Sequence, residues 1–177
     1  MGKIFYIDKS AFSTEEALKA ILSKAYELPN AVILRTKNGK PYVENGPFFS
    51  VSHTERTLFI AFSSAQVGLD AELLSREINY ASILKKFPSE ECEEIACTQD
   101  FLKHWVAKES AVKYLDGTLA RGLQSLSFVK NCLTYKGKEL PVKLTFLELE
   151  GHILSVCGEE DFSKAELIRL PTLYYNI

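Results

Sequence analysis

The chain has 177 residues, of which 46% are hydrophobic and 25% are charged, a composition typical of an ordinary globular protein. It argues against a disordered chain and against a fibrous repeat. The 21 basic and 23 acidic residues leave a net charge of −2, so the molecule as a whole has no electrostatic attraction to nucleic acid or to an anionic membrane.

The cysteines and histidines form no metal-binding pattern. The sequence contains no C-x-x-C pair, and His53, His104 and His152 are scattered, so we expect reduced, buried thiols and no zinc site. The first ten residues lack the apolar core of a signal peptide, and no apolar run is long enough to span a bilayer. We therefore expect a cytoplasmic protein.

The first part of the chain predicts strands around one helix. Residues 3–8 have the β-branched and aromatic content of a strand, and the following helix begins with Ser13 and Glu16 in a capping-box pattern. After a strand and the turn at 37–40, short turns separate three apolar runs, which favours an antiparallel meander. These runs are residues 48–53, 57–63 and 66–73.

The pattern turns helical again from residue 75 to about residue 115, with Pro88 and the acidic run 89–94 marking a helix start. Short predicted strands fill the rest. Residues 152–170 resemble residues 58–72 in their order of strand, loop and strand, a similarity that would fit a pseudo-repeat. We expect an N-terminal lobe over residues 1–74 and a C-terminal lobe over 75–177, with one asymmetric site between them.

Two carboxylates, Asp70 and Glu72, stand one residue apart in an otherwise apolar strand. Alternation places them on one face, about 6–7 Å apart, opposite the core residues Val67, Leu69 and Ala71. Like charges this close repel unless a cation lies between them, and Mg²⁺ prefers such oxygen ligands. Gly68, on the same face, would leave space for a ligand. The alternative is an edge strand with solvated acids.

The segment 101–117 carries an apolar stripe at helical spacing, formed by Phe101, Trp105, Val112 and Leu115. Lys108 falls inside this stripe, while Glu109 and Lys113 flank it. Buried charge needs a partner, which a metal ion and phosphates would supply. The alternative, an ordinary Glu–Lys pair at i, i+4, explains Glu109 and Lys113 but leaves Lys108 unexplained.

A third cluster combines basic groups with a hydroxyl and an imidazole, which suits a phosphate monoester. Its members are Arg35, Lys37, Lys40, Ser52 and His53. Taken singly, each also fits a solvated turn or an ordinary surface or core histidine.

Together these segments resemble the Sfp-type 4′-phosphopantetheinyl transferases of the holo-acyl-carrier-protein synthase superfamily. The matching motifs are GKP at 39–41, FSVSHT at 49–54, VGLDAE at 67–72 and WVAKESAVK at 105–113. The chain departs from the family at Ser50, where asparagine is usual, and it is short before the first motif.

The resemblance implies an α+β pseudo-dimer of two similar lobes with the active site between them. It implies transfer of 4′-phosphopantetheine from coenzyme A to a serine of an apo acyl or peptidyl carrier protein, dependent on Mg²⁺ and releasing 3′,5′-ADP. The implied metal ligands are Asp70, Glu72 and Glu109, and the implied catalytic residues are Asp70, Glu109 and Lys113. The implied coenzyme A contacts are Lys40, Ser52, His53, Lys108 and Lys113.

We expect the carrier protein to dock on residues 73–87, where Arg76, Lys85 and Lys86 lie beside apolar side chains. Two internal lobes make a monomer sufficient, and neither nucleic acid nor a membrane is an expected partner. Two other functions stay open. One is a non-catalytic module that binds coenzyme A or a carrier protein, and the other is a Mg²⁺-dependent nucleotide pyrophosphatase.

Overall fold

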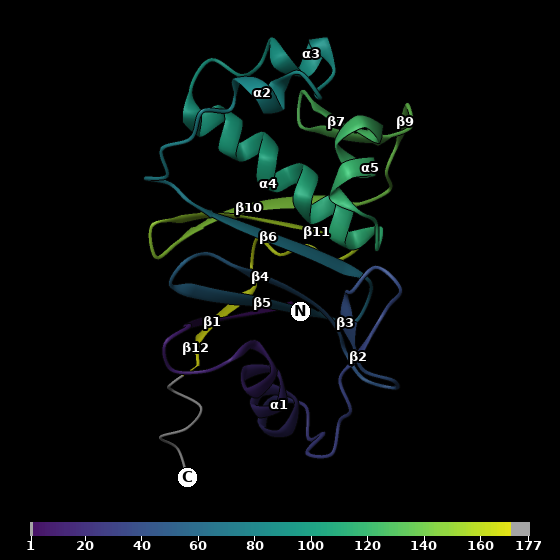
Figure 1. Cartoon of the computed structure of the whole chain (residues 1–177). Helices are drawn as coiled ribbons and strands as arrows, with labels where there is room; N and C mark the ends of the chain where they lie inside the picture. The colour runs from purple at the N-terminus through teal and green to yellow at the C-terminus, as the bar shows by residue number, and fades with distance from the viewer. Residues whose placement is uncertain (1, 171–177) are drawn as a thin grey trace.

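A computed structural model of the chain describes residues 2–170, apart from the side chains of residues 119–121. Two main β-sheets are stacked on each other, and a helix covers the outer face of each sheet (Figure 1). This mixture of helices with largely antiparallel strands confirms the predicted α+β class. Residues 171–177 of the predicted second lobe lie outside the described residues.

The first unit runs strand, helix, strand, strand. Its elements are β1 (Lys3–Asp8), α1 (Thr14–Ala25), β4 (Phe48–His53) and β5 (Thr57–Ser63). The predicted capping box is confirmed: the Ser13 hydroxyl accepts from the Glu16 N–H, and the Glu16 carboxylate accepts from the Ser13 N–H. β5 lies between β1 and β4, antiparallel to both.

The second unit repeats this connectivity. Its elements are β6 (Val67–Leu73), α4 (Thr98–Tyr114), β10 (Lys143–Leu149) and β11 (His152–Gly158). β11 lies between β6 and β10, antiparallel to both, as β5 lies between β1 and β4. The last described strand, β12 (Glu166–Arg169), returns to the first sheet and pairs in parallel with β1.

Strand pairing corrects two expectations. β6 does not belong to the predicted antiparallel meander, because its partner is β11 and not β5. The predicted lobe boundary at residue 74 therefore cuts off β6 from its own sheet, and it assigns β12 to the wrong sheet. The change of sheet falls between β5 and β6, at residues 64–66.

Shorter elements complete the fold. The predicted helical region from residue 75 contains two single turns, α2 (Ala81–Leu84) and α3 (Ser89–Cys92), before α4. Pro88 directly precedes α3, as the helix-start pattern predicts. The others are β2 (Leu34–Arg35), β3 (Pro41–Tyr42), α5 (Leu119–Ser125), β7 (Leu126–Val129), β8 (Cys132–Tyr135) and β9 (Lys138–Glu139).

The hydrophobic core forms in layers that follow strand alternation. Phe5 and Ile7 of β1 face α1, whereas Ile4 points into the layer between the two sheets. Val67, Leu69 and Ala71 of β6 enter this central layer, as predicted. The other face of β6 therefore points toward α4, which fixes where Asp70 lies.

No helix within residues 2–170 has the length and apolar character needed to cross a membrane. The four cysteines are all free, but only Cys157 is buried, so the expectation of buried thiols is wrong for the other three.

Candidate active site

The two sheets meet where β4 runs beside β6, and two serine hydroxyls join these strands. Ser50 Oγ accepts from the Leu69 N–H at 2.9 Å, and Ser52 Oγ accepts from the Ala71 N–H at 3.2 Å. Both hydroxyls are buried, so they satisfy N–H groups at the edge of β6 that would otherwise lack a partner. The alternate serines of the FSVSHT segment thus fix β6 against the first sheet.

Gly68 provides a close approach between β6 and α4. A Cβ atom there would lie 1.9 Å from the Ser110 carbonyl oxygen and 2.5 Å from the Tyr114 nitrogen. From the sequence, Gly68 was expected to leave space for a ligand. This expectation is wrong, because the helix backbone fills that space. Gly68 instead brings the side chains of α4 within reach of the β6 carboxylates.

Asp70 lies at the centre of this contact and is buried. Its Oδ1 atom accepts from the Ser52 hydroxyl at 2.8 Å and from the Lys113 ammonium at 2.7 Å. Three distant segments, β4, β6 and α4, therefore meet at one carboxylate oxygen. The structure brings Ser52, Asp70 and Lys113 together, as the predicted site requires.

Glu72 and Glu109 complete the acidic cluster. Glu72 pairs with Arg76, whose Nη1 lies 2.6 Å from Glu72 Oε2. Glu109 is half-buried, and its carboxylate has no hydrogen bond or ion pair among the residues described. Burial, followed by the charges of Asp70 and Glu72, raises the pKa of Glu109 from 4.5 to about 7, although Lys113 and Arg76 oppose this shift. These couplings show that the three predicted metal ligands share one electrostatic environment.

Lys108 lies away from this cluster, although it is the residue before Glu109. It is fully buried, its Nζ lies 2.7 Å from Glu91 Oε2, and it lies 3.8 Å from the centre of the Phe87 ring. His104 Nδ1 lies 3.2 Å from the other oxygen of Glu91. This buried partner removes the reason for placing Lys108 at bound phosphates, so the expected phosphate contact is corrected to an internal ion pair. Glu91 was not among the predicted site residues, because its only signal in the sequence is its place in an acidic helix start.

Lys40 also has internal partners. Its ammonium donates to the carbonyl oxygens of Val67 and Lys113, each at 2.8 Å, and burial lowers its pKa to about 8. The same turn reaches Asp116, because Thr36 Oγ1 donates to its carboxylate and the Asn38 amide donates to its carbonyl. The turn at 36–40 therefore holds the C-terminal end of the helix that carries Lys113.

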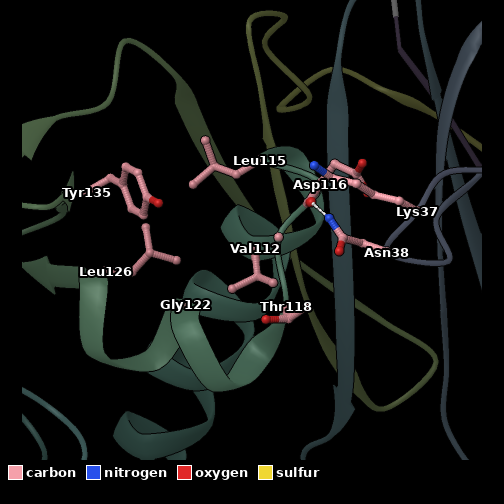
Figure 2. A pocket seen from close by; sticks show the side chains of 10 residues that line it. Lys37, Asn38, Val112, Leu115, Asp116, Thr118, Gly122, Leu126 and Tyr135 are labelled. Carbon is pink, nitrogen blue, oxygen red and sulfur yellow. Dashed lines mark hydrogen bonds between the residues drawn. The ribbon is translucent and has the colours of Figure 1, made fainter.

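Figure 2 shows the Asn38–Asp116 contact at the rim of a pocket of about 400 Å³. Apolar side chains of Val112, Leu115 and Leu126 form one wall of this pocket. Apart from Lys37, a member of the predicted basic cluster, it contains none of the predicted site residues.

A larger groove, of about 920 Å³, opens beside Glu72. It is bordered by exposed His53 and by Arg76, so it connects the predicted phosphate contact with the acidic cluster. The other lining residues are Lys9, Thr54, Glu55, Arg56, Thr57, Leu73, Glu150 and His152.

The donor chemistry of the cluster suits a divalent cation. Within residues 2–170, no three carboxylate, histidine or cysteine side chains are grouped so that they could hold a metal ion as they stand. Two of the carboxylates are instead paired with cationic side chains of the same chain, Asp70 with Lys113 and Glu72 with Arg76. Oxygen ligands that already attract positive charge fit Mg²⁺.

Comparison with known proteins points to the same segment. A profile of the 4′-phosphopantetheinyl transferase superfamily matches residues 66–157, just over half of the chain, and this range includes β6 and α4. The 4′-phosphopantetheinyl transferase gsp of Aneurinibacillus migulanus is 30% identical over 157 residues. The alignment covers 81% of this chain but only 66% of that relative's length. The chain therefore belongs to the 4′-phosphopantetheinyl transferase superfamily.

Proposed function

We propose that this protein transfers the 4′-phosphopantetheine group of coenzyme A to a serine of an acyl or peptidyl carrier protein and releases 3′,5′-ADP. The observation that carries the proposal is the cluster of Asp70, Glu72, Glu109 and Lys113, which lies within the segment that matches the superfamily. The repeated strand and helix order supports two lobes of a pseudo-dimer, with this site between them. Because one chain supplies all four side chains, a monomer is sufficient.

Asp70, Glu72 and Glu109 would hold Mg²⁺. When bound, the ion would neutralise the negative charge of the pyrophosphate group. Side chains of the site would supply the phosphate contact and the proton transfers that the reaction also requires. Lys113, whose ammonium lies next to Asp70, would contact a pyrophosphate oxygen or protonate the departing nucleotide.

Glu109 is the proposed acceptor of the proton from the carrier serine, directly or through a water molecule. It points toward the acidic cluster from α4, and its pKa near 7 makes it a better base than an ordinary carboxylate at neutral pH. A metal ligand is a weaker base, so the two roles oppose each other at the same carboxylate. Proton transfer through a water molecule would relieve this conflict.

His53 is the proposed contact to a coenzyme A phosphate, because it is exposed at the border of the large groove. Lys40 and Ser52 stay predicted contacts, and each would have to leave or share its internal hydrogen bonds to reach the ligand. The proposed carrier surface is residues 73–87. Arg76, Lys85 and Lys86 are exposed there, which suits an acidic partner.

The test is intact-mass analysis of an apo acyl carrier protein after incubation with this protein, coenzyme A and Mg²⁺, with EDTA as control. We expect the carrier to gain the mass of one phosphopantetheine arm, and we expect EDTA to prevent the gain. Release of 3′,5′-ADP without a carrier would instead identify a pyrophosphatase. Binding of coenzyme A without turnover, across several carriers, would identify a non-catalytic module.

A further inference from the structure

Arg76 lies outside the four matched motifs, yet it forms a short ion pair with a predicted metal ligand. β6 ends at Leu73, and a turn in which the Arg76 N–H donates to the Leu73 carbonyl at 3.0 Å brings the chain back toward the strand. This turn places the Arg76 guanidinium on Glu72, at 2.6 Å. The Arg76–Glu72 ion pair therefore depends on the turn that follows β6. The two residues are four positions apart, but they do not lie on a helix.

The two cationic partners of the acidic cluster differ in how easily they can leave. The Lys113 side chain is 28% exposed and belongs to α4, whereas the Arg76 side chain is 45% exposed at the edge of the groove. Glu72 itself is only 14% exposed. Arg76 can turn into solvent at little cost, while the carboxylate that it leaves stays in place.

We infer that Arg76 is an internal counter-ion of Glu72 that competes with the divalent cation and thereby sets the metal affinity of the site. A metal ion that binds Glu72 through Oε2, or through both oxygens, must displace the guanidinium, because Arg76 Nη1 already occupies Oε2. The lost ion pair weakens metal binding by the free energy of that pair. Arg76 is thus a positioning residue, and this inference rests on the metal ligands of the proposed function.

The test measures Mn²⁺ binding directly, by the loss of the electron paramagnetic resonance signal of free Mn²⁺, in EDTA-treated protein without carrier or coenzyme A. Arg76→Gln is compared with the wild type. The matched control is Arg56→Gln, which removes the same charge from the same groove. Because partly exposed ion pairs are weak, we expect Arg76→Gln to tighten Mn²⁺ binding about two- to fivefold. Arg56→Gln is expected to leave it within error.

A double-mutant cycle isolates the pair. With Glu72→Gln already present, adding Arg76→Gln should no longer tighten Mn²⁺ binding, because the competition has been removed. Unchanged affinity in Arg76→Gln, or equal tightening in both arginine variants, would overturn the inference and leave the metal site standing. Failure of the wild type and all variants to bind Mn²⁺ would overturn both the inference and the metal ligands, whereas phosphopantetheine transfer is judged separately by the mass assay.

Discussion

Lys108 and Glu109 are neighbours on α4, but they belong to two charged clusters with different properties. Around Lys108 the cluster is closed: Glu91 has the Lys108 ammonium at one oxygen and His104 at the other, and all three side chains are buried. Around Glu109 the cluster is open. Two cationic side chains pair with Asp70 and Glu72, and Glu109 has no ion pair of its own among the residues described.

The difference separates stability from function. Buried charges that neutralise each other hold parts of the chain together, whereas carboxylates left with excess negative charge and a raised pKa are typical of binding or catalytic sites. One helix can present both because adjacent residues point about 100° apart around its axis. Variants of each cluster should therefore affect different measurements.

The largest effect is expected in the closed cluster. Lys108→Met should lower the free energy of unfolding by about 3–5 kcal/mol, because it leaves the Glu91 carboxylate buried without its cation. Urea unfolding followed by circular dichroism measures this change. Lys103→Met, on the same helix but partly exposed, should cost less than about 0.5 kcal/mol. If Lys108→Met costs as little as this control, the cluster is not a structural ion pair.

Asp70→Asn tests the open cluster. Phosphopantetheine transfer should fall about 10²- to 10³-fold, equivalent to about 3–4 kcal/mol, because a proposed metal ligand and the ion pair to Lys113 would be lost. The free energy of unfolding should change by less than about 1 kcal/mol. Rates come from the mass assay, with Glu139→Gln, exposed and outside the proposed carrier surface, as control. A rate within tenfold of wild type, in a folded variant, would remove Asp70 from the site.

Glu109→Gln should stabilise the metal-free protein in a pH-dependent way. The folded state raises the pKa of Glu109 from 4.5 to about 7, so the carboxylate costs stability once the pH exceeds 4.5, and the cost is complete above about 7. Glutamine mimics the protonated form. The gain should reach up to about 3 kcal/mol at pH 8 and be much smaller at pH 5, measured by urea unfolding with EDTA. Equal gains at both pH values would contradict the raised pKa.

The smallest expected effect is the difference in transfer rate between variants of the two serines that join β4 to β6. Ser50→Ala and Ser52→Ala should each cost about 1–2 kcal/mol, because each leaves one N–H of β6 without its partner. Only Ser52→Ala removes a hydrogen bond to Asp70. Its transfer rate should fall about tenfold, while Ser50→Ala keeps the wild-type rate. Equal rates in the two variants would show that Ser52 does not orient Asp70.

The features that could be predicted from the sequence are those that depend on local patterns. The Ser13 cap and the alternation along β6 depend on residues close in the chain, and both are confirmed. The site motifs also indicated Asp70 and Lys113, which the structure places 2.7 Å apart.

The errors concern partners that are distant in sequence. Nothing near β6 indicates that it pairs with β11, and so the predicted boundary at residue 74 was wrong. Gly68 looked like space for a ligand because the helix residues that fill this space, Ser110 and Tyr114, lie more than forty positions further along the chain. The partner of Lys108 was missed for the same reason, since no periodicity joins Glu91 to α4.

The return of β12 to β1 has a consequence for how the chain folds during synthesis. β1 precedes the rest of the described fold, but its parallel partner, in which Glu166 pairs with Lys3, is made 163 residues later. Pairing over such a separation is entropically costly and slows folding. The second unit, whose strands and helix all lie between residues 67 and 158, can assemble earlier on the ribosome. The first sheet then closes after the second unit, so a nascent chain exposes one edge of β1 until β12 has been made.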